Sequence, residues 1–587
     1  QAVELDLSEF VGRVPVELNN GSLFPPIGQL TYLLTLPPYG FYWFVLAEEG
    51  DWPDWHTPAP EPMPEYQTFV IIRDLIETLT VTSRELFERD VLPPYLAKRR
   101  WFSAKNEALN EVRLANIVRL PGREIYLCKL ETTSRSGIAC WLLPLAIVWE
   151  GESMMALPNQ LALARVRQGR RVGLLTDAFA LPEFAHGAIG ALAVSATVRL
   201  PQGQIHFEHL PQRARALHLP PNAEVEWITA EQSNSSLIVG DAVMLKIFRR
   251  ISSGPHPEVE MGRYLTERGF ANAPPLLGEV VYVDKEGARS SMGVAQSFIR
   301  NQGDAWSWLL DDLVRGIDAL ATPPDKGTTE AEHMADYESL AAVIGRRLAE
   351  MHGVLAQETT AEDFAPRHAT KADTEDWLNY ARKELGDAFD MIGKHRWERP
   401  EDSATAKALM ERRDDLLASM TQMAASGEGT LMTRIHGDFH LGQLLVVGGD
   451  IYIIDFEGEP GRPLAARRDK LSPLRDVAGL LRSLDYAAAT VANRKSAGTA
   501  TVAAEQRDSV LARFRTATPA AFLNAYRATL EARGESFNEP LLNLFMIEKS
   551  AYEIRYEAAN RPSWLPIPLG GLAALVTRFL HQTGEQR

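Results

Sequence analysis

Residues 436–460 read HGDFHLGQLLVVGGDIYIIDFEGEP, and this stretch decides the fold. Two apolar runs, LLVV and IYIIDF, flank the turn-forming GGD, a pattern that predicts a β-hairpin. The loop before the hairpin carries Asp438 and Gln443, and the second strand delivers Asp455 at its end. We therefore expect two carboxylates and one amide to meet at the mouth of the hairpin.

Phosphoryl transfer requires such a set of side chains. One aspartate orients the attacking hydroxyl and accepts its proton, while a second aspartate and an amide oxygen hold Mg²⁺ on the phosphates. On this interpretation Asp438 is the catalytic residue, and Gln443 and Asp455 are the metal ligands.

The two histidines of the loop raise two alternatives. His436 and His440 are four residues apart, but the intervening GDF favours a turn, the sequence has no H-E-x-x-H helix, and no third soft ligand is near. Zinc is therefore disfavoured. The other alternative is a turn without chemistry, in which His436 and Asp438 only hydrogen-bond the backbone.

Residues upstream favour the catalytic interpretation. Lys246 lies in the apolar strand pattern AVMLKIFRR, where an ammonium group needs a partner. The following helix offers Glu260 or Glu258, about 200° apart around its axis. We favour Glu260, because Glu258 follows Pro257 in the first turn, where a carboxylate has a local reason to lie. Such a Lys–Glu pair would fix the ammonium against the phosphates of a nucleotide.

Other candidate nucleotide-binding residues flank this strand. No Gly-rich P-loop motif is present, which argues against a P-loop NTPase. The backbone N–H groups and hydroxyls of a preceding turn could bind phosphate oxygens, and backbone groups in a later connector could hold an adenine. The turn residues are Ser233, Asn234, Ser235 and Ser236, and the connector residues are Gln296, Phe298 and Ile299.

Composition limits the class of protein. The 587 residues carry a formal charge of −16, which gives no electrostatic reason to bind nucleic acid. The longest apolar run is too short to span a bilayer, no signal peptide opens the sequence, and the two cysteines are too far apart for a C-x-x-C motif. We expect a cytoplasmic protein without a membrane partner. Because the first residue is Gln, the chain is expected to be a fragment of a longer protein.

The distribution of patterns predicts an α+β fold in several parts. We expect a short antiparallel β segment at 1–47, a Pro-rich linker at 48–65, an α+β cap at 66–195, a β-rich nucleotide-binding part at 196–300 and a helical part at 301–587.

The ordered set of Lys246, Glu260, HGDFHLGQ and IDFEGE resembles the bilobal protein-kinase-like fold of the aminoglycoside and choline phosphotransferases. More closely, the segments YLAKRRWFSAK, EQSNSSLIVGD, LKIFRR, DFEGEPGRPLAARRDKLSPLRDVAGLLRSLDYAA and YEAANRPSW are similar to the maltokinases. This resemblance covers residues 85–575 and implies ATP and Mg²⁺ as cofactors and transfer of the γ-phosphoryl group to the anomeric hydroxyl of maltose. In place of the glycine of a kinase DFG motif the sequence has Glu457.

The N-terminal segment has a resemblance of its own. Residues 5–47 are similar to the C-terminal β-sheet tail of trehalose synthase, which implies a trehalose synthase module as a fused or associated partner.

A late helical segment is the candidate acceptor site. Lys549, Tyr552, Glu553 and Tyr556 follow i, i+3, i+4, i+7 spacing and share one helix face, which offers aromatic surface and polar groups to a sugar, although a half-buried packing stripe has the same pattern. Arg468 lies in a basic cluster that either contacts substrate or is a solvated face.

Two residues are assigned supporting roles. His436 is expected to orient the loop, and Asp476 is expected to hydrogen-bond the loop backbone, as in kinase-like folds. The rivals to maltose phosphorylation are a kinase for glucosamine, an aminoglycoside or choline, and an inactive kinase-like scaffold for trehalose synthase.

Overall fold

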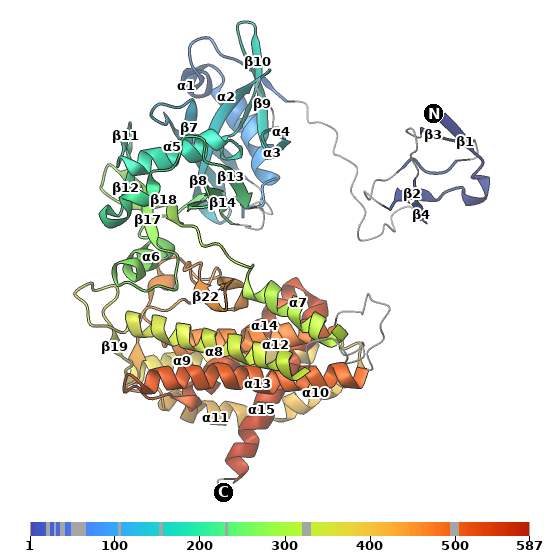
Figure 1. Ribbon diagram of the computed structural model, residues 1–587, viewed down its shortest axis with the longest axis vertical. Helices are drawn as coiled ribbons and strands as arrows, with labels where there is room; N and C mark the ends of the chain where they lie inside the picture. Colours follow the sequence, from blue (N-terminus) through green and yellow to red (C-terminus); the bar gives the residue numbers. More distant parts are fainter. Residues whose placement is uncertain are drawn as a thin grey trace. The chain divides into compact units, whose positions relative to one another are not determined.

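The chain was described from a computed structural model (Figure 1). The described residues are 2–18, 24–28, 31–35, 42–48, 66–103, 107, 109–151, 156–228, 233–319, 330–493 and 504–585. They form two compact units, residues 1–68 and 69–587. Apart from Glu48, the Pro-rich linker expected at 48–65 lies outside the described residues.

The small unit consists of two antiparallel strand pairs. β1 (Ala2–Leu5) pairs with β3 (Tyr32–Thr35), and β2 (Val14–Glu17) pairs with β4 (Phe44–Ala47). The short antiparallel β segment expected at 1–47 is therefore confirmed, and its four strands form two separate ladders. A small apolar core that includes Ile27, Tyr32 and Leu34 holds the unit together.

The large unit begins with a seven-stranded antiparallel sheet in the order β5-β9-β10-β8-β7-β6, to which β16 is added beside β8. Buried apolar residues such as Trp141, Leu143 and Leu145 of β8 pack under three short helices. These elements are β5 (Thr68–Val70), α1 (Leu75–Glu77), α2 (Arg84–Leu86), α3 (Leu92–Ala97), β6 (Glu111–Arg119), β7 (Ile125–Ser134), β8 (Gly137–Trp149), α4 (Ala156–Gln160), β9 (Ala162–Gln168), β10 (Arg171–Asp177) and α5 (Pro182–Ala193).

A second seven-stranded antiparallel sheet follows, in the order β11-β12-β17-β18-β15-β14-β13. It carries Lys246 on β15, next to the connector that leaves β18. Its elements are β11 (Thr197–Leu200), β12 (Gly203–His209), β13 (Val225–Ile228), β14 (Ser235–Val239), β15 (Val243–Ile247), β16 (Arg250–Ile251), α6 (Pro257–Glu267), β17 (Leu276–Asp284) and β18 (Arg289–Ser297).

The two sheets share one hydrophobic core. Leu120, Ile125 and Leu142 from the first sheet cluster with Leu237, Leu245 and Ala295 from the second, and α5 contributes Phe184 and Leu192. The boundary expected at 195/196 therefore falls inside a common core.

The remainder of the large unit is mostly helical (Figure 1). The expected hairpin at 444–456 is confirmed: β21 pairs with β22 around Gly448 and Gly449, both of which have positive φ. The elements are α7 (Ala305–Ala319), α8 (Glu330–Leu355), β19 (Arg367–His368), α9 (Lys371–Lys394), α10 (Pro400–Glu411), α11 (Arg413–Ala425), β20 (Leu431–Met432), β21 (Leu444–Val447), β22 (Asp450–Ile453), α12 (Leu474–Asn493), α13 (Ala504–Glu531), α14 (Glu539–Asn560) and α15 (Pro566–Glu585).

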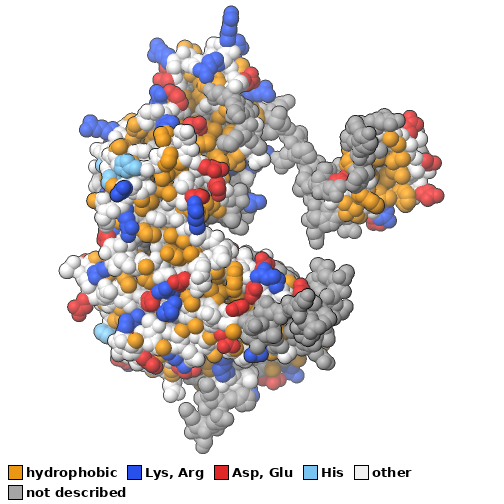
Figure 2. All heavy atoms as spheres, viewed as in Figure 1, with side chains coloured by type: hydrophobic (Ala, Val, Ile, Leu, Met, Phe, Trp, Pro, Cys, Tyr) orange, Lys and Arg blue, Asp and Glu red, His pale blue; other side chains and the backbone are white. Residues whose placement is uncertain are grey.

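The surface of the large unit mixes charges of both signs on the face shown in Figure 2. Among the described residues, no helix is both long and apolar enough to cross a membrane.

Candidate active site

Hydrogen bonds to buried groups hold the loop 436–443 in place. The amide of Asp438 donates to Nδ1 of His436 (3.3 Å), and Nε2 of the same ring donates to the carbonyl of Ile454 (2.9 Å). One neutral tautomer of His436 satisfies both bonds. The buried imidazole thus joins the loop of Asp438 to the strand end that carries Asp455.

Asp476 of α12 also anchors this loop. Its carboxylate accepts hydrogen bonds from the amides of His436 (2.8 Å) and Gly437 (2.9 Å) and from Nε2 of His352 (3.1 Å). The helix approaches closely because it has Gly479 beneath the loop, where a Cβ atom would lie 2.5 Å from the carbonyl oxygen of Phe439. Packing therefore fixes the loop before any ligand binds.

Asp455 lies at the centre of a polar cluster. One carboxylate oxygen accepts a hydrogen bond from Nζ of Lys246 (2.8 Å), and the other accepts from Nε2 of Gln443 (3.2 Å). Burial alone would raise the pKa of Asp455, but the ammonium of Lys246 outweighs it and the pKa lies below its ordinary value. The carboxylate is therefore charged.

Glu457, which replaces the kinase glycine, is a second partner of Lys246. Its carboxylate lies 2.7 Å from Nζ and accepts a hydrogen bond of 2.6 Å from the amide of Asn234. The turn at 233–236 is thereby connected to the hairpin that carries Asp455.

The pairing expected between Lys246 and Glu260 is wrong. Glu260 forms a two-pronged ion pair with Arg468 (2.6 and 2.8 Å) and a longer contact with Arg434 (3.4 Å). The rejected candidate, Glu258, faces the site instead, and Gln296 donates a hydrogen bond to it (3.0 Å). Because the two glutamates lie on different sides of α6, only one can face Lys246.

Glu258 is a buried acid. Burial raises its pKa to about 7, with Asp455 and Glu457 adding to the rise and Lys246 opposing it. One of its carboxylate oxygens has no hydrogen-bond partner among the described residues.

The oxygen atoms of this cluster fit a magnesium ion. Carboxylate oxygens of Glu258, Asp455 and Glu457 lie within 4.8 Å of one another, and Gln443, whose nitrogen is bonded to Asp455, retains its amide oxygen. A hard cation prefers such oxygen ligands.

The four turn residues predicted to bind a nucleotide have different surroundings in the structure. Ser233 is exposed at the turn, Asn234 is bonded to Glu457, and Ser235 accepts a hydrogen bond from the side chain of Arg249. Ser236 lies opposite Lys246 in the β14–β15 ladder.

The connector residues are partly occupied by contacts within the chain. The amide of Phe298 donates to the carbonyl of Ala242 (2.8 Å), and the carbonyl of Ile299 accepts from the side chain of Asn301 (2.8 Å). The amide of Phe298 is therefore occupied in this conformation, whereas the carbonyl of Ile299 can accept a second hydrogen bond. The side chain of Gln296 belongs to the Glu258 cluster.

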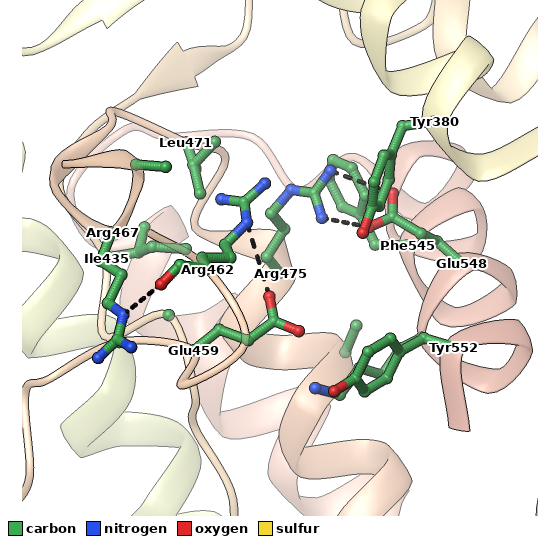
Figure 3. A pocket seen from close by; sticks show the side chains of 15 residues that line it. Tyr380, Ile435, Glu459, Arg462, Arg467, Leu471, Arg475, Phe545, Glu548 and Tyr552 are labelled. Carbon is green, nitrogen blue, oxygen red and sulfur yellow. Dashed lines mark hydrogen bonds and ion pairs between the residues drawn. The ribbon is translucent and has the colours of Figure 1, made fainter. Parts of the chain in front are cut away.

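A small pocket lies beside the loop of Asp438 (Figure 3). Lys549 and Tyr552 of α14 line it, as do Tyr380 of α9 and residues of the segment after the DFE motif. Burial opposes the charge on Lys549, but Asp438, Glu459 and Glu553 together raise its pKa above the ordinary value.

The pocket lining carries more positively charged than negatively charged side chains. Two acids, Glu459 and Glu548, lie in the lining, and each has an arginine beside it: Arg462 at 3.7 Å and Arg475 at 2.5 Å (Figure 3). The side chain of Arg467 donates to backbone carbonyls, and among the described residues no carboxylate lies within ion-pair distance of Lys549. The lining is therefore net cationic and has no unpaired acid.

Three of the residues expected at the acceptor site do not line this pocket. Glu553 forms an ion pair with Arg482 (2.8 Å), and Tyr556 lies outside the pocket and is exposed. Arg468 forms ion pairs with Glu260 and with Asp363 (3.1 Å). Helical spacing places all four α14 residues on one face, but that face is wide. Lys549 and Tyr552 line the pocket, whereas Glu553 packs against α12.

Sequence reasoning missed several residues of the site. Tyr380 gave no signal, because a single tyrosine on an amphipathic helix has no distinguishing pattern. Glu459, Arg462 and Arg475 belong to the dense run of charges after DFE, and that density was the available signal.

The comparisons with known proteins bear on the fold described above. Residues 224–458 match the family described as phosphotransferase enzyme family, and residues 1–43 match the maltogenic amylase C-terminal domain. A glucosamine kinase solved with glucosamine, ADP and inorganic phosphate superimposes with a TM-score of 0.57, covering 82% of this chain and 99% of that chain at 22% identity. The bilobal kinase-like fold is therefore shown.

Two individual relatives match stretches of very different length in this chain. A glucosamine kinase of Mycolicibacterium smegmatis is 29% identical over 60% of this chain and 79% of its own length. A trehalose synthase of Pimelobacter is 60% identical over 48 residues, which are 8% of each chain. The large unit thus resembles sugar kinases, and a short stretch resembles trehalose synthase.

Proposed function

We propose that this chain is an ATP-dependent sugar kinase that phosphorylates the anomeric hydroxyl of maltose. The observation that carries the proposal is the position of Asp438. Its charge helps to raise the pKa of Lys549 in the pocket, and His436 joins its loop to the strand end before Asp455, which contacts Lys246 and Gln443.

Each residue has a role that follows from its surroundings. Asp438 accepts the hydrogen bond of the acceptor hydroxyl, and Lys246 neutralises the phosphates of ATP. Asp455 and Gln443 would hold Mg²⁺, with Glu457 and Glu258 as the nearest further oxygen ligands. When bound, the ion neutralises charge on the transferred phosphoryl group. Because the protein groups are already fixed by Asp476 and His436, positioning contributes most of the acceleration.

The charges of the pocket favour a neutral sugar over a cationic one. Arg462 and Arg475 are paired with the two acids of the lining, which leaves Arg467 and Lys549 as the cations that an ammonium group on the acceptor would meet. Asp438 is the acid that opposes them. Hydroxyl groups, by contrast, can accept hydrogen bonds from these cations. Glucosamine, aminoglycosides and choline fit this arrangement less well than maltose does.

The N-terminal match supports maltose among the neutral sugars. A fused or associated trehalose synthase module would release the sugar that this site consumes, and the match to the maltogenic amylase C-terminal domain covers residues 1–43. Tyr380 and Tyr552 supply aromatic surface on which a second glucose unit can stack.

A panel assay tests the acceptor. ADP release is measured with maltose, trehalose, glucose and glucosamine, and the product is examined by phosphorus NMR, where a phosphate on C1 couples to the anomeric proton. We expect maltose to give the highest kcat/KM and an anomeric phosphate.

Glucosamine is the second candidate, since the relative from Mycolicibacterium smegmatis has that name. A higher kcat/KM for glucosamine would overturn the acceptor assignment and leave the kinase assignment intact. Lys549→Met sharpens the comparison, because removing this cation should improve glucosamine relative to maltose. ADP release with none of the sugars would favour the inactive scaffold.

A further inference from the structure

A buried ion pair joins the first sheet of the large unit to the segment between β15, which carries Lys246, and β16. Nη2 of Arg249 lies 2.9 Å from Oδ2 of Asp177, and both side chains are only 1% exposed. Asp177 ends β10 and also accepts hydrogen bonds from the amide of Phe179 (3.0 Å) and the hydroxyl of Tyr95 (3.3 Å).

The guanidinium of Arg249 is also bound to the phosphate-facing turn. Its Nε donates to Oγ of Ser235 (2.8 Å), the first residue of β14. Ser235 directly follows Asn234, whose side chain reaches Glu457, and it lies opposite Ile247 in the ladder with β15. A single side chain therefore connects Asp177 to the turn that precedes Lys246.

Aromatic side chains and backbone pairing fix the guanidinium in this position. The Cζ atom of Arg249 lies over two aromatic rings, 4.9 Å from the centroid of Trp101 and 5.2 Å from the centroid of Phe179. The carbonyl of Arg249 accepts a hydrogen bond from the amide of Leu142 in β8 (2.7 Å), and β16 continues the same sheet. The first sheet thus supplies the surroundings of Arg249 from several sides.

We propose that Asp177 and Arg249 are positioning residues through which the cap formed by the first sheet sets the place of the 233–236 turn, and so sets the affinity for the nucleotide. The inference rests on the proposed function, in which this turn and Lys246 bind ATP. A buried guanidinium with a carboxylate on one side and a serine hydroxyl on the other cannot move without leaving one of them unpaired. The turn therefore holds its position relative to the cap.

The first experiment measures ADP binding by titration calorimetry on the full chain. Arg249→Met should weaken ADP binding about tenfold, the effect expected for loss of a hydrogen bond from a charged group that orders the site. Ser235→Ala keeps the Asp177–Arg249 pair and should weaken binding about threefold. In Arg249→Met kcat at saturating ATP should stay within about twofold of the wild type, because Asp438 and Asp455 are untouched.

Thr176→Val is the matched control. Thr176 precedes Asp177 on β10, is fully buried and donates a hydrogen bond of 2.8 Å to the carbonyl of Pro158, with no contact to the turn. It should lower the melting temperature while leaving ADP affinity unchanged. Thermal unfolding of every variant separates misfolding from weakened binding.

A double-mutant cycle decides between positioning and direct phosphate contact. In the Arg249→Met background, Ser235→Ala should have no further effect on ADP affinity, because the hydroxyl acts through the guanidinium. Additive losses, or unchanged affinity in folded Arg249→Met and Ser235→Ala, would overturn the inference. A wild-type chain that binds no ADP would instead refute the proposed function on which it rests.

Discussion

At Asp455 the backbone has a φ of 63°, a left-handed conformation that costs a residue with a Cβ atom about 1 kcal/mol. The same residue bonds Lys246 and Gln443. This conformation turns the carboxylate away from the direction that an extended strand would give it. Strain of this kind persists where the surroundings over-determine the geometry, which agrees with a functional role.

Asp438→Asn tests the proposed acceptor of the hydroxyl proton. The amide retains the shape but cannot accept the proton, so kcat should fall at least about 100-fold. Steady-state ADP release measures the loss, and the melting temperature should be unchanged because the hydrogen bonds that anchor the loop come from its backbone. Exposed Asp469→Asn is the control, and near-wild-type turnover in Asp438→Asn would remove Asp438 from the mechanism.

His256 gives a pH dependence of stability. Burial lowers its pKa from 6.5 to about 4, although Glu457 opposes this, and its ring stacks on Phe248. The unfolded chain binds the proton first, so this contribution to the free energy of unfolding is present above pH 6.5 and is lost as pH falls toward 4. His256→Gln should therefore flatten denaturant-derived stability over this range. The exposed His218→Gln should retain the wild-type slope, and an equal slope in His256→Gln would contradict the assignment.

Among the elements, α6 links the sheet that carries Lys246 to the helical part of the chain. One side of the helix presents Glu258 to the Lys246 cluster, and another presents Glu260 to Arg468 and Arg434. Arg434 is 1% exposed, and Glu260 is the carboxylate that compensates its buried charge. The ion pairs of Glu260 thus set the position from which Glu258 faces the site.

Glu260→Gln should lower the free energy of unfolding by about 2 kcal/mol, because a buried guanidinium loses its carboxylate. Chemical denaturation measures this change, and the KM for ATP should rise as α6 loses its anchor. Glu267→Gln, an exposed position at the end of the same helix, is the control. If stability and KM were both unchanged, the ion pair would have no role in placing α6.

The limits of sequence reasoning are clear at α6 and at the hairpin. The contact between Gln443 and Asp455 follows from the hairpin that the sequence predicts, because the two residues are close in sequence. Glu260 was misassigned because its partner Arg468 is 208 positions away in the sequence. Helical geometry says that two glutamates face different directions, but it does not say which direction faces the lysine.

For the whole molecule, the division into two units has a direct test. The core around Ile27 and Tyr32 lies within residues 1–68, and the larger cores draw on residues 69–587. A chain of residues 66–587 should therefore retain the melting temperature and ATP-dependent turnover of the full chain. Differential scanning calorimetry and the ADP-release assay measure these, and loss of either would show that the small unit contributes to the kinase unit.

His436 has a consequence for how the molecule can move. Its two ring nitrogens join the amide of Asp438 to the carbonyl of Ile454, so the loop 436–443 and the strand end before Asp455 belong to one rigid body. Lys246 belongs to the other sheet and reaches Asp455 only through its flexible side chain. A shift of the sheet that carries Lys246 can therefore change the distance from Lys246 to Asp455, while the two hydrogen bonds of His436 keep the loop of Asp438 joined to Asp455's strand end.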